Sequence, residues 1–260
     1  MCELYAINSR WPVRANAGLA EFFGDSPYHP HGWGLAWYEG THKDARFQLH
    51  KEPITAVDSN YLSYLLDEPI RANRLVAHIR NATRGIMSFE NCHPFIGRDM
   101  SGRRWVIAHN GTILNDELLS GYDQWIEGQT DSEQVVLYLM DLIDEATQRV
   151  GHDLDFGGRF NVLSQVMDTL SDFNKLNLVL DDGEYTYVHT NTVQDTLFVR
   201  RGANVATFCT RPLGDGNGWE PVPHCRLLAY REGQCVQVGH NHAKAFDDKL
   251  YLRILAMEGR

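Results

Sequence analysis

Basic residues are scarce in this chain of 260 residues. Its 24 Lys and Arg stand against 34 Asp and Glu, which gives a formal net charge of −10 at pH 7, and no basic run interrupts the acidic balance. Nucleic acids and anionic membranes attract clustered Lys and Arg. The sequence therefore predicts neither nucleic acid nor a membrane as a partner.

Long apolar runs are also missing. No stretch approaches the roughly 20 apolar residues that a membrane-spanning helix needs, and the N-terminal residues lack the basic start and apolar stretch of a secretory signal. Hydrophobic residues make up 43% of the chain and charged residues 22%, which is typical of a soluble globular protein. We expect a cytoplasmic protein.

Close cysteine pairs are absent too. The chain has five cysteines, an odd number with no C-x-x-C spacing, which argues against both a disulfide framework and a thiolate zinc site. The pairs His29-x-His31 and His240-x-His242 have no Cys or acidic partners at familiar spacing. We expect no metal site.

Linkers, repeats and low-complexity segments are missing as well, so residues 1–260 are predicted to form a single domain. Helical periodicity predicts three helices, Asp58–Leu66, Asp131–Arg149 and Phe160–Phe173. The predicted strands are Leu4–Asn8, Gly34–Tyr38, Phe47–His50, Leu75–Ile79, Trp105–His109, Leu176–Leu180, Tyr185–His189, Thr196–Arg200, Arg226–Tyr230 and Cys235–Val238.

Two local signals sharpen this prediction. Thr130 with Glu133 forms a capping-box pattern at the start of the longest helix. Asp181-Asp182-Gly183 between two predicted strands indicates a hairpin. Antiparallel hairpins mixed with a few helices favour an α+β sandwich over alternating βαβ units.

Cys2 directly follows the initiator methionine. We expect Met1 to be removed, because cysteine is small, and Cys2 would then carry a thiol and a free α-amine in one residue. An α-amine with an ordinary pKa of about 7.7–8.0 can accept the thiol proton, directly or through a water. Taken alone, however, Cys2 is better explained as a small apolar residue that enters the first strand.

Four further segments contain polar residues beside apolar strands or at a helix start: His31–Trp37, His78–Gly85, His109–Thr112 and Gln129–Glu133. Each has a structural explanation. Asn110-Gly111 is a hairpin-turn signal, Thr130 begins a capping box, Arg80 could be an ion-pair partner and His31 a satisfied loop histidine. Singly, none of them establishes a function.

Together, in this order after Cys2, the segments resemble the class II glutamine amidotransferases, which are N-terminal-nucleophile hydrolases. The subgroup that they resemble most is that of the stand-alone YafJ-like amidotransferases. The motifs that carry the resemblance are His31-Gly-Trp-Gly34, His78-Ile-Arg80, Glu90-Asn-Cys-His-Pro-Phe95, Ala108-His-Asn-Gly111 and Thr130-Asp-Ser-Glu133. They extend from Cys2 to about Glu133; beyond that point the resemblance is only architectural.

The resemblance implies a role for each matching residue. Cys2 would be the nucleophile, and the Asn110 amide and the Gly111 N–H would form the oxyanion hole. Arg80 would bind the substrate α-carboxylate, for which a planar guanidinium is suited. Asp131 would pair with the α-ammonium group, and the hydroxyl of Thr83 would contact the substrate.

Some positions depart from the family or invite another interpretation. Asn81 stands where an aromatic residue is common, and Arg84 where one branch of the family has a histidine; both departures concern the pocket wall and hence the choice of substrate. Cys92-His93 resembles a nucleophile and its base, but adjacent side chains tend to diverge, so we expect a structural role.

The resemblance implies a four-layer αββα sandwich and a reaction that needs no cofactor. In that reaction, Cys2 forms a γ-glutamyl thioester from glutamine or a γ-glutamyl amide, and water releases glutamate. Three alternatives remain open at this point. The chain supplies ammonia to a separate synthase subunit, hydrolyses a γ-glutamyl amide with a larger amine in thiol or peptide metabolism, or is a non-catalytic ligand-binding module. The intact set of motif residues argues against the third.

Overall fold

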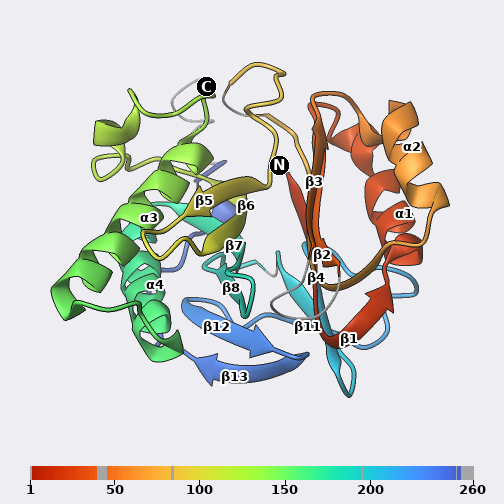
Figure 1. The fold of residues 1–260 in the computed structure, drawn as a ribbon. Helices are drawn as coiled ribbons and strands as arrows, with labels where there is room; N and C mark the ends of the chain where they lie inside the picture. Colours follow the sequence, from red (N-terminus) through yellow and green to blue (C-terminus); the bar gives the residue numbers. More distant parts are fainter. Residues whose placement is uncertain (1, 40–45, 83–84, 195, 250, 253–260) are drawn as a thin grey trace.

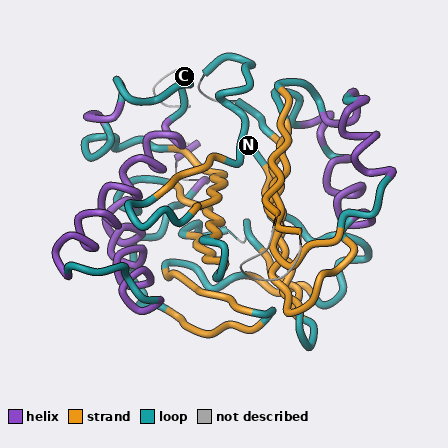
Figure 2. The backbone as a smooth tube through the Cα atoms, viewed as in Figure 1, coloured by secondary structure: helices purple, strands orange, loops and turns teal. Residues whose placement is uncertain are grey.

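The computed structural model describes residues 2–39, 46–82, 85–194, 196–249 and 251–252. Two antiparallel sheets lie face to face, and helices cover the outer surface of each (Figure 1). Figure 2 shows the same arrangement, with the helices on the two outer sides of the strands. The predicted αββα sandwich is therefore confirmed.

The first sheet has the strand order β11-β9-β10-β1-β4-β2-β3. Its strands are β1 (Glu3–Arg14), β2 (Trp33–Glu39), β3 (Arg46–Glu52), β4 (Arg71–Ile79), β9 (Phe198–Arg201), β10 (Val205–Cys209) and β11 (Trp219–Pro221). Strand β1 lies in the middle and pairs with β10 on one side and β4 on the other. The start of the chain is thereby fixed within a sheet.

The second sheet has the order β13-β12-β8-β7-β6-β5. Its strands are β5 (Phe95–Arg98), β6 (Arg104–Thr112), β7 (Lys175–Asp181), β8 (Thr186–Thr190), β12 (Arg226–Arg231) and β13 (Gln234–Val238). The predicted hairpin between β7 and β8 is confirmed: the strands are antiparallel, the Asp182 N–H donates to the Tyr185 carbonyl at 3.1 Å, and Gly183 has a φ of +84°.

Helices α1 (Asn16–Gly24) and α2 (Asn60–Asp67) cover the first sheet, and α3 (Asp131–Val150) and α4 (Phe156–Leu170) cover the second (Figure 1). Leu19, Phe22 and Leu62 pack on the outer face of the first sheet. Between the sheets the core is built from smaller residues, among them Ala6 and Ala108. None of the helices in the described ranges is long and apolar enough to cross a membrane.

The three predicted helices and ten predicted strands are confirmed, with ends that differ by up to four residues except in β1, which continues six residues beyond the predicted Asn8. The prediction missed β5, β10, β11 and α1. These strands have only three to five residues. Helix α1 follows Ala15, which provides no side-chain cap, so the usual start signal is missing.

The predicted capping box at α3 is half right. The Thr130 hydroxyl accepts a hydrogen bond from the Glu133 N–H at 3.3 Å, as expected. The Glu133 carboxylate, however, accepts from the N–H groups of Glu127 and Gly128, both at 2.8 Å. Glu133 therefore holds the preceding loop over the helix start and does not complete the capping box.

Candidate active site

Cys2 directly precedes β1 (Glu3–Arg14). The N-terminal end of the chain lies between the two sheets, at one end of the sandwich (Figure 1). The Cys2 Sγ accepts a hydrogen bond from the Asn81 N–H at 3.3 Å and lies 3.6 Å from the Asn81 carbonyl oxygen. Burial raises the pKa of the Cys2 thiol, the Asn81 N–H and the charge of Arg80 act in the opposite direction, and Asp131 raises it further. The thiol is therefore protonated at neutral pH and needs a base before it can attack.

Arg80 follows β4 and is almost completely buried. Its guanidinium donates to the carbonyl oxygens of Ile86 at 2.9 Å and Gly85 at 3.3 Å. Arg80 thus holds the turn at residues 85–86 while its charge acts on the nearby Cys2 thiol. These two bonds to carbonyl groups give Arg80 a structural role in the loop.

Asp131 begins α3 and comes close to the same site. Its Oδ2 accepts a hydrogen bond from the Ile113 N–H at 3.2 Å, just after the end of β6. Its charge acts on Cys2 and on His109. Opposite charges from Asp131 and Arg80 therefore flank the Cys2 thiol, and the helix dipole favours the carboxylate at this N-terminal position.

Asn110 and Gly111 lie inside β6, directly opposite Asn177 and Leu176 of β7. A hairpin turn at this dipeptide is therefore excluded. Alternation along the strand places Asn110 on the face between the sheets, with Val106 and Ala108. Among the described residues, the buried Asn110 side chain has no hydrogen-bond partner, so its amide is available to a ligand.

Gly111 cannot be replaced without displacing its neighbours. A Cβ atom there would lie 2.0 Å from the Lys175 carbonyl oxygen and 2.2 Å from Nε2 of His109. Strand β5 pairs with β6 only as far as Ile107. From Ala108 onward, one edge of β6 thus has no partner from β5 in the described sheet.

His31 holds the segment that follows Arg80. The His31 N–H donates to the Arg80 carbonyl at 3.0 Å, and His31 Nδ1 accepts from the Ala82 N–H at 2.9 Å. His31 is therefore a satisfied loop histidine, as its structural explanation required. It also holds the backbone around Asn81, whose N–H donates to the Cys2 sulfur.

A second support joins the loop after Arg80 to the start of α3. The Ile86 N–H donates to Gln129 Oε1 at 3.1 Å, and the Gln129 N–H donates to Asn91 Oδ1 at 2.7 Å. Asn91 Nδ2 donates back to the Ile86 carbonyl at 3.0 Å. The sequence contained this signal, because Asn91 and Gln129 belong to two of the quoted segments, but their contact depends on the fold.

Asn81, which the sequence predicted in the pocket wall, also contacts Cys2 directly. Its backbone contacts the Cys2 sulfur, and its side-chain amide donates to the Tyr28 carbonyl at 3.3 Å. Thr83 and Arg84, the other two predicted pocket positions, lie outside the described residues, as does Met1. The predicted roles of Thr83 and Arg84 stay predictions.

Cys92 and His93 point to different neighbours. The Cys92 thiol donates to the carbonyls of Ser88 and Glu52, and burial raises its pKa to about 11. The His93 ring lies 4.1 Å from that of His78 between the sheets. Their geometry fits a structural role.

Neither His-x-His pair gathers ligands around a metal ion. His29 lies 3.5 Å from Glu3, whereas His31 bonds to Ala82. His240 lies 3.3 Å from Asp168, and His242 lies 3.1 Å from His189. In the part of the chain that the structure describes, no group of three or more His, Cys, Asp or Glu is arranged to hold a metal.

A thiol on which the charges of an arginine and an aspartate act, at one end of two stacked sheets, is an arrangement suited to nucleophilic chemistry. Residues 1–204 match the family of glutamine amidotransferases of class II, and the chain belongs to this family. It is 31% identical over 210 residues to YafJ of Escherichia coli (strain K12), which is named as a glutamine amidotransferase; the match covers 80% of each chain.

Solved structures agree on the fold. A glutamine amidotransferase from Pseudomonas aeruginosa PA01, itself assigned by prediction, superposes with a TM-score of 0.62 at 20% identity, over 91% of this chain and all of the other. The glutamine phosphoribosylpyrophosphate amidotransferase of Bacillus subtilis superposes with a TM-score of 0.66 at 17% identity. The latter match covers 93% of this chain and 49% of the larger enzyme.

Proposed function

We propose that this protein hydrolyses the γ-carboxamide of glutamine or of a γ-glutamyl amide, with Cys2 as the nucleophile. The observation that carries the proposal is the side-chain amide of Asn110, which makes no hydrogen bond to the described residues although the residue is only 5% exposed. Asn110 lies on the face of β6 that is directed between the sheets, and its amide can donate to a developing oxyanion.

The reaction begins at Cys2. After Met1 is removed, the α-amine of Cys2 takes the thiol proton, which burial otherwise holds on the sulfur. The sulfur then attacks the amide carbon, and negative charge moves onto the carbonyl oxygen. The side-chain amide of Asn110 and the N–H of Gly111 stabilise that oxygen.

The tetrahedral intermediate collapses when the C–N bond breaks and the amine leaves with a proton from the Cys2 ammonium. The γ-glutamyl group remains as a thioester on Cys2. Water, deprotonated by the same α-amine, attacks the thioester and releases glutamate. The reacting atoms balance without a metal or a redox partner.

Arg80 and Asp131 bind the amino-acid end of the substrate. Their opposite charges match an α-carboxylate and an α-ammonium, which glutamine and every γ-glutamyl amide share. These two residues therefore select the γ-glutamyl group. They do not determine which amine is released.

The test is glutamate release from a panel of γ-glutamyl compounds, glutamine included, by chains whose N-terminus has been verified by mass spectrometry. Cys2→Ala should abolish release without unfolding the chain, and 6-diazo-5-oxo-norleucine should label Cys2 but not Cys92. Chains that keep Met1 should lose about 10²–10³-fold or more in rate, because their Cys2 nitrogen is an amide. Labelling of Cys92, or full turnover with Met1 attached, would contradict the proposal.

A further inference from the structure

A second concentration of charge lies away from Cys2, at the other end of the sandwich. Arg74 of β4 pairs with Asn8 of β1, six residues from Cys2, which is about 20 Å along an extended strand. Here an open cavity of about 560 Å³ lies between the sheets. We call it the arginine cavity because four arginines line it: Arg74, Arg98, Arg103 and Arg104. Its other polar side chains are those of Tyr38, Ser101, Asp153 and Asp182.

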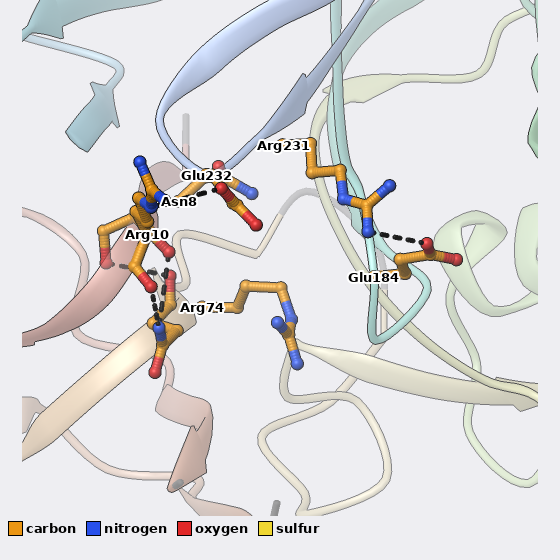
Figure 3. Close-up of a pocket in the computed structure, with 8 residues that line it drawn as sticks. Asn8, Arg10, Arg74, Glu184, Arg231 and Glu232 are labelled. Atoms are coloured by element: carbon orange, nitrogen blue, oxygen red, sulfur yellow. Dashed lines mark hydrogen bonds and ion pairs between the residues drawn. The ribbon is translucent and has the colours of Figure 1, made fainter. Parts of the chain in front are cut away.

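Arg74 is the innermost of these arginines. It is only 9% exposed, and beyond it a narrower pocket continues to Arg10 and Arg231. Figure 3 shows the Arg74 guanidinium between two ion pairs, Arg10–Glu232 and Arg231–Glu184, without joining either. The side chain of Arg74 therefore lines both the wide cavity and the narrow pocket.

Few groups satisfy this guanidinium. Within the described residues it makes no hydrogen bond, and its nearest carboxylate oxygen is Oδ1 of Asp181, 3.4 Å from Nε. Both Asp181 oxygens already accept shorter bonds, from the Gly183 N–H at 2.9 Å and the Thr186 hydroxyl at 2.7 Å. Asp182, the next acid, binds Arg159 at 2.8 Å. Most of the donors on Arg74 are therefore left for another group.

Tyr38 adds a second available donor. Its ring lies under the Arg74 guanidinium at 4.6 Å, and its hydroxyl is buried without a partner among the described residues. Burial raises the pKa of Tyr38, so the hydroxyl keeps its proton at neutral pH. The Tyr38 hydroxyl and the Arg74 guanidinium lie side by side, and an acceptor with negative charge would stabilise both.

We propose that the arginine cavity binds a phosphate group, either as a free phosphate-type anion or as part of a small phosphorylated molecule. Four arginines line the cavity: one each from β4, β5 and β6, and Arg103 from the turn between β5 and β6. Guanidinium groups bind oxyanions in two-point contacts, and a tetrahedral phosphate offers oxygens in several directions where a planar carboxylate offers two in one plane. Four arginines against the two aspartates Asp153 and Asp182 leave the lining with a net positive charge, in a chain whose overall charge is −10.

The test is isothermal titration calorimetry, in which inorganic pyrophosphate is added to the full chain at constant ionic strength and pH 7. Arg74→Gln should weaken binding about 10- to 100-fold, because a hydrogen-bonded charge is lost. Tyr38→Phe removes only a hydroxyl that bonds to no described protein group, so it should leave the melting temperature unchanged and weaken binding several-fold. Arg200→Gln, an exposed arginine on β9, is the matched control and should bind like the wild type.

The Tyr38→Phe variant keeps the test decisive should Arg74→Gln fail to fold beside Asp181. The proposal is overturned if the wild-type chain shows no saturable binding at millimolar pyrophosphate. It is overturned equally if Tyr38→Phe binds like the wild type, or if Arg200→Gln weakens binding as much as the cavity variants do. Hydrolysis at Cys2 enters none of these readouts, so a failure here is separate from a failure of the proposed function.

Discussion

Replacing Asn110 by alanine distinguishes a catalytic amide from a structural one, because β7 places a second asparagine, Asn177, directly opposite. The two side chains differ in their partners. Asn177 donates to the Thr196 hydroxyl at 3.0 Å and accepts from the Thr190 hydroxyl at 2.6 Å. The Asn110 side chain bonds to none of the described residues. The same substitution at both positions therefore has different consequences.

For Asn110→Ala we expect a small change in stability, below about 1 kcal/mol, because no protein group loses its partner. The kcat for glutamate release should fall about 10²–10³-fold, or roughly 3–4 kcal/mol, with little change in KM, because the donor acts once charge has developed on the oxygen. For Asn177→Ala we expect the reverse: a loss of about 1–3 kcal/mol of stability from the hydroxyls left unsatisfied, and a kcat close to that of the wild type.

The assay combines urea unfolding with steady-state kinetics on the same preparations. The reasoning would be refuted if Asn110→Ala lost stability as Asn177→Ala does while its kcat stayed within tenfold of the wild type. A loss of affinity alone in Asn110→Ala would make this residue a binding group and remove it from the oxyanion hole.

Three further predictions concern the charged and buried groups around the site. Arg80→Lys should raise KM about 10- to 100-fold, because a single ammonium cannot hold both loop carbonyls and a substrate carboxylate. Asp131→Asn should cost only about 0.3–1 kcal/mol of stability but reduce turnover of free substrates more than that of α-N-acylated analogues. Burial lowers the pKa of His78 to about 3 and that of His93 well below its ordinary value, so urea unfolding should show stability falling as the pH drops from about 6.5 toward 3, by up to about 1.4 kcal/mol per unit for each histidine.

Each of these predictions has a result that contradicts it. An unchanged KM in Arg80→Lys would leave Arg80 as a support for the loop alone. Unaltered discrimination in Asp131→Asn, with stability reduced, would make Asp131 a helix-start residue only. The pH slope should become shallower in His93→Phe; an identical slope would show that these buried rings do not control the acid sensitivity.

The sequence by itself determined most of the secondary structure, and its motifs supplied the candidate residues of the site. Hydrophobic alternation located ten strands, and the Thr130 cap located the start of α3, because both signals arise between residues close in the chain. The motif residues Cys2, Arg80 and Asp131 were also identifiable as residue types suited to the chemistry.

Tertiary structure alone decided what these residues touch. Asn110-Gly111 satisfies the local rule for a hairpin turn, yet pairing with β7 keeps it inside a strand, because long-range hydrogen bonds outweigh a local turn preference. The contact between Cys2 and the Asn81 backbone joins residues 79 positions apart. Arg74 and Tyr38 drew no notice in the sequence. An arginine on a strand becomes a buried cation with most of its donors unpaired only when two sheets pack together, since packing removes the water that would otherwise satisfy them.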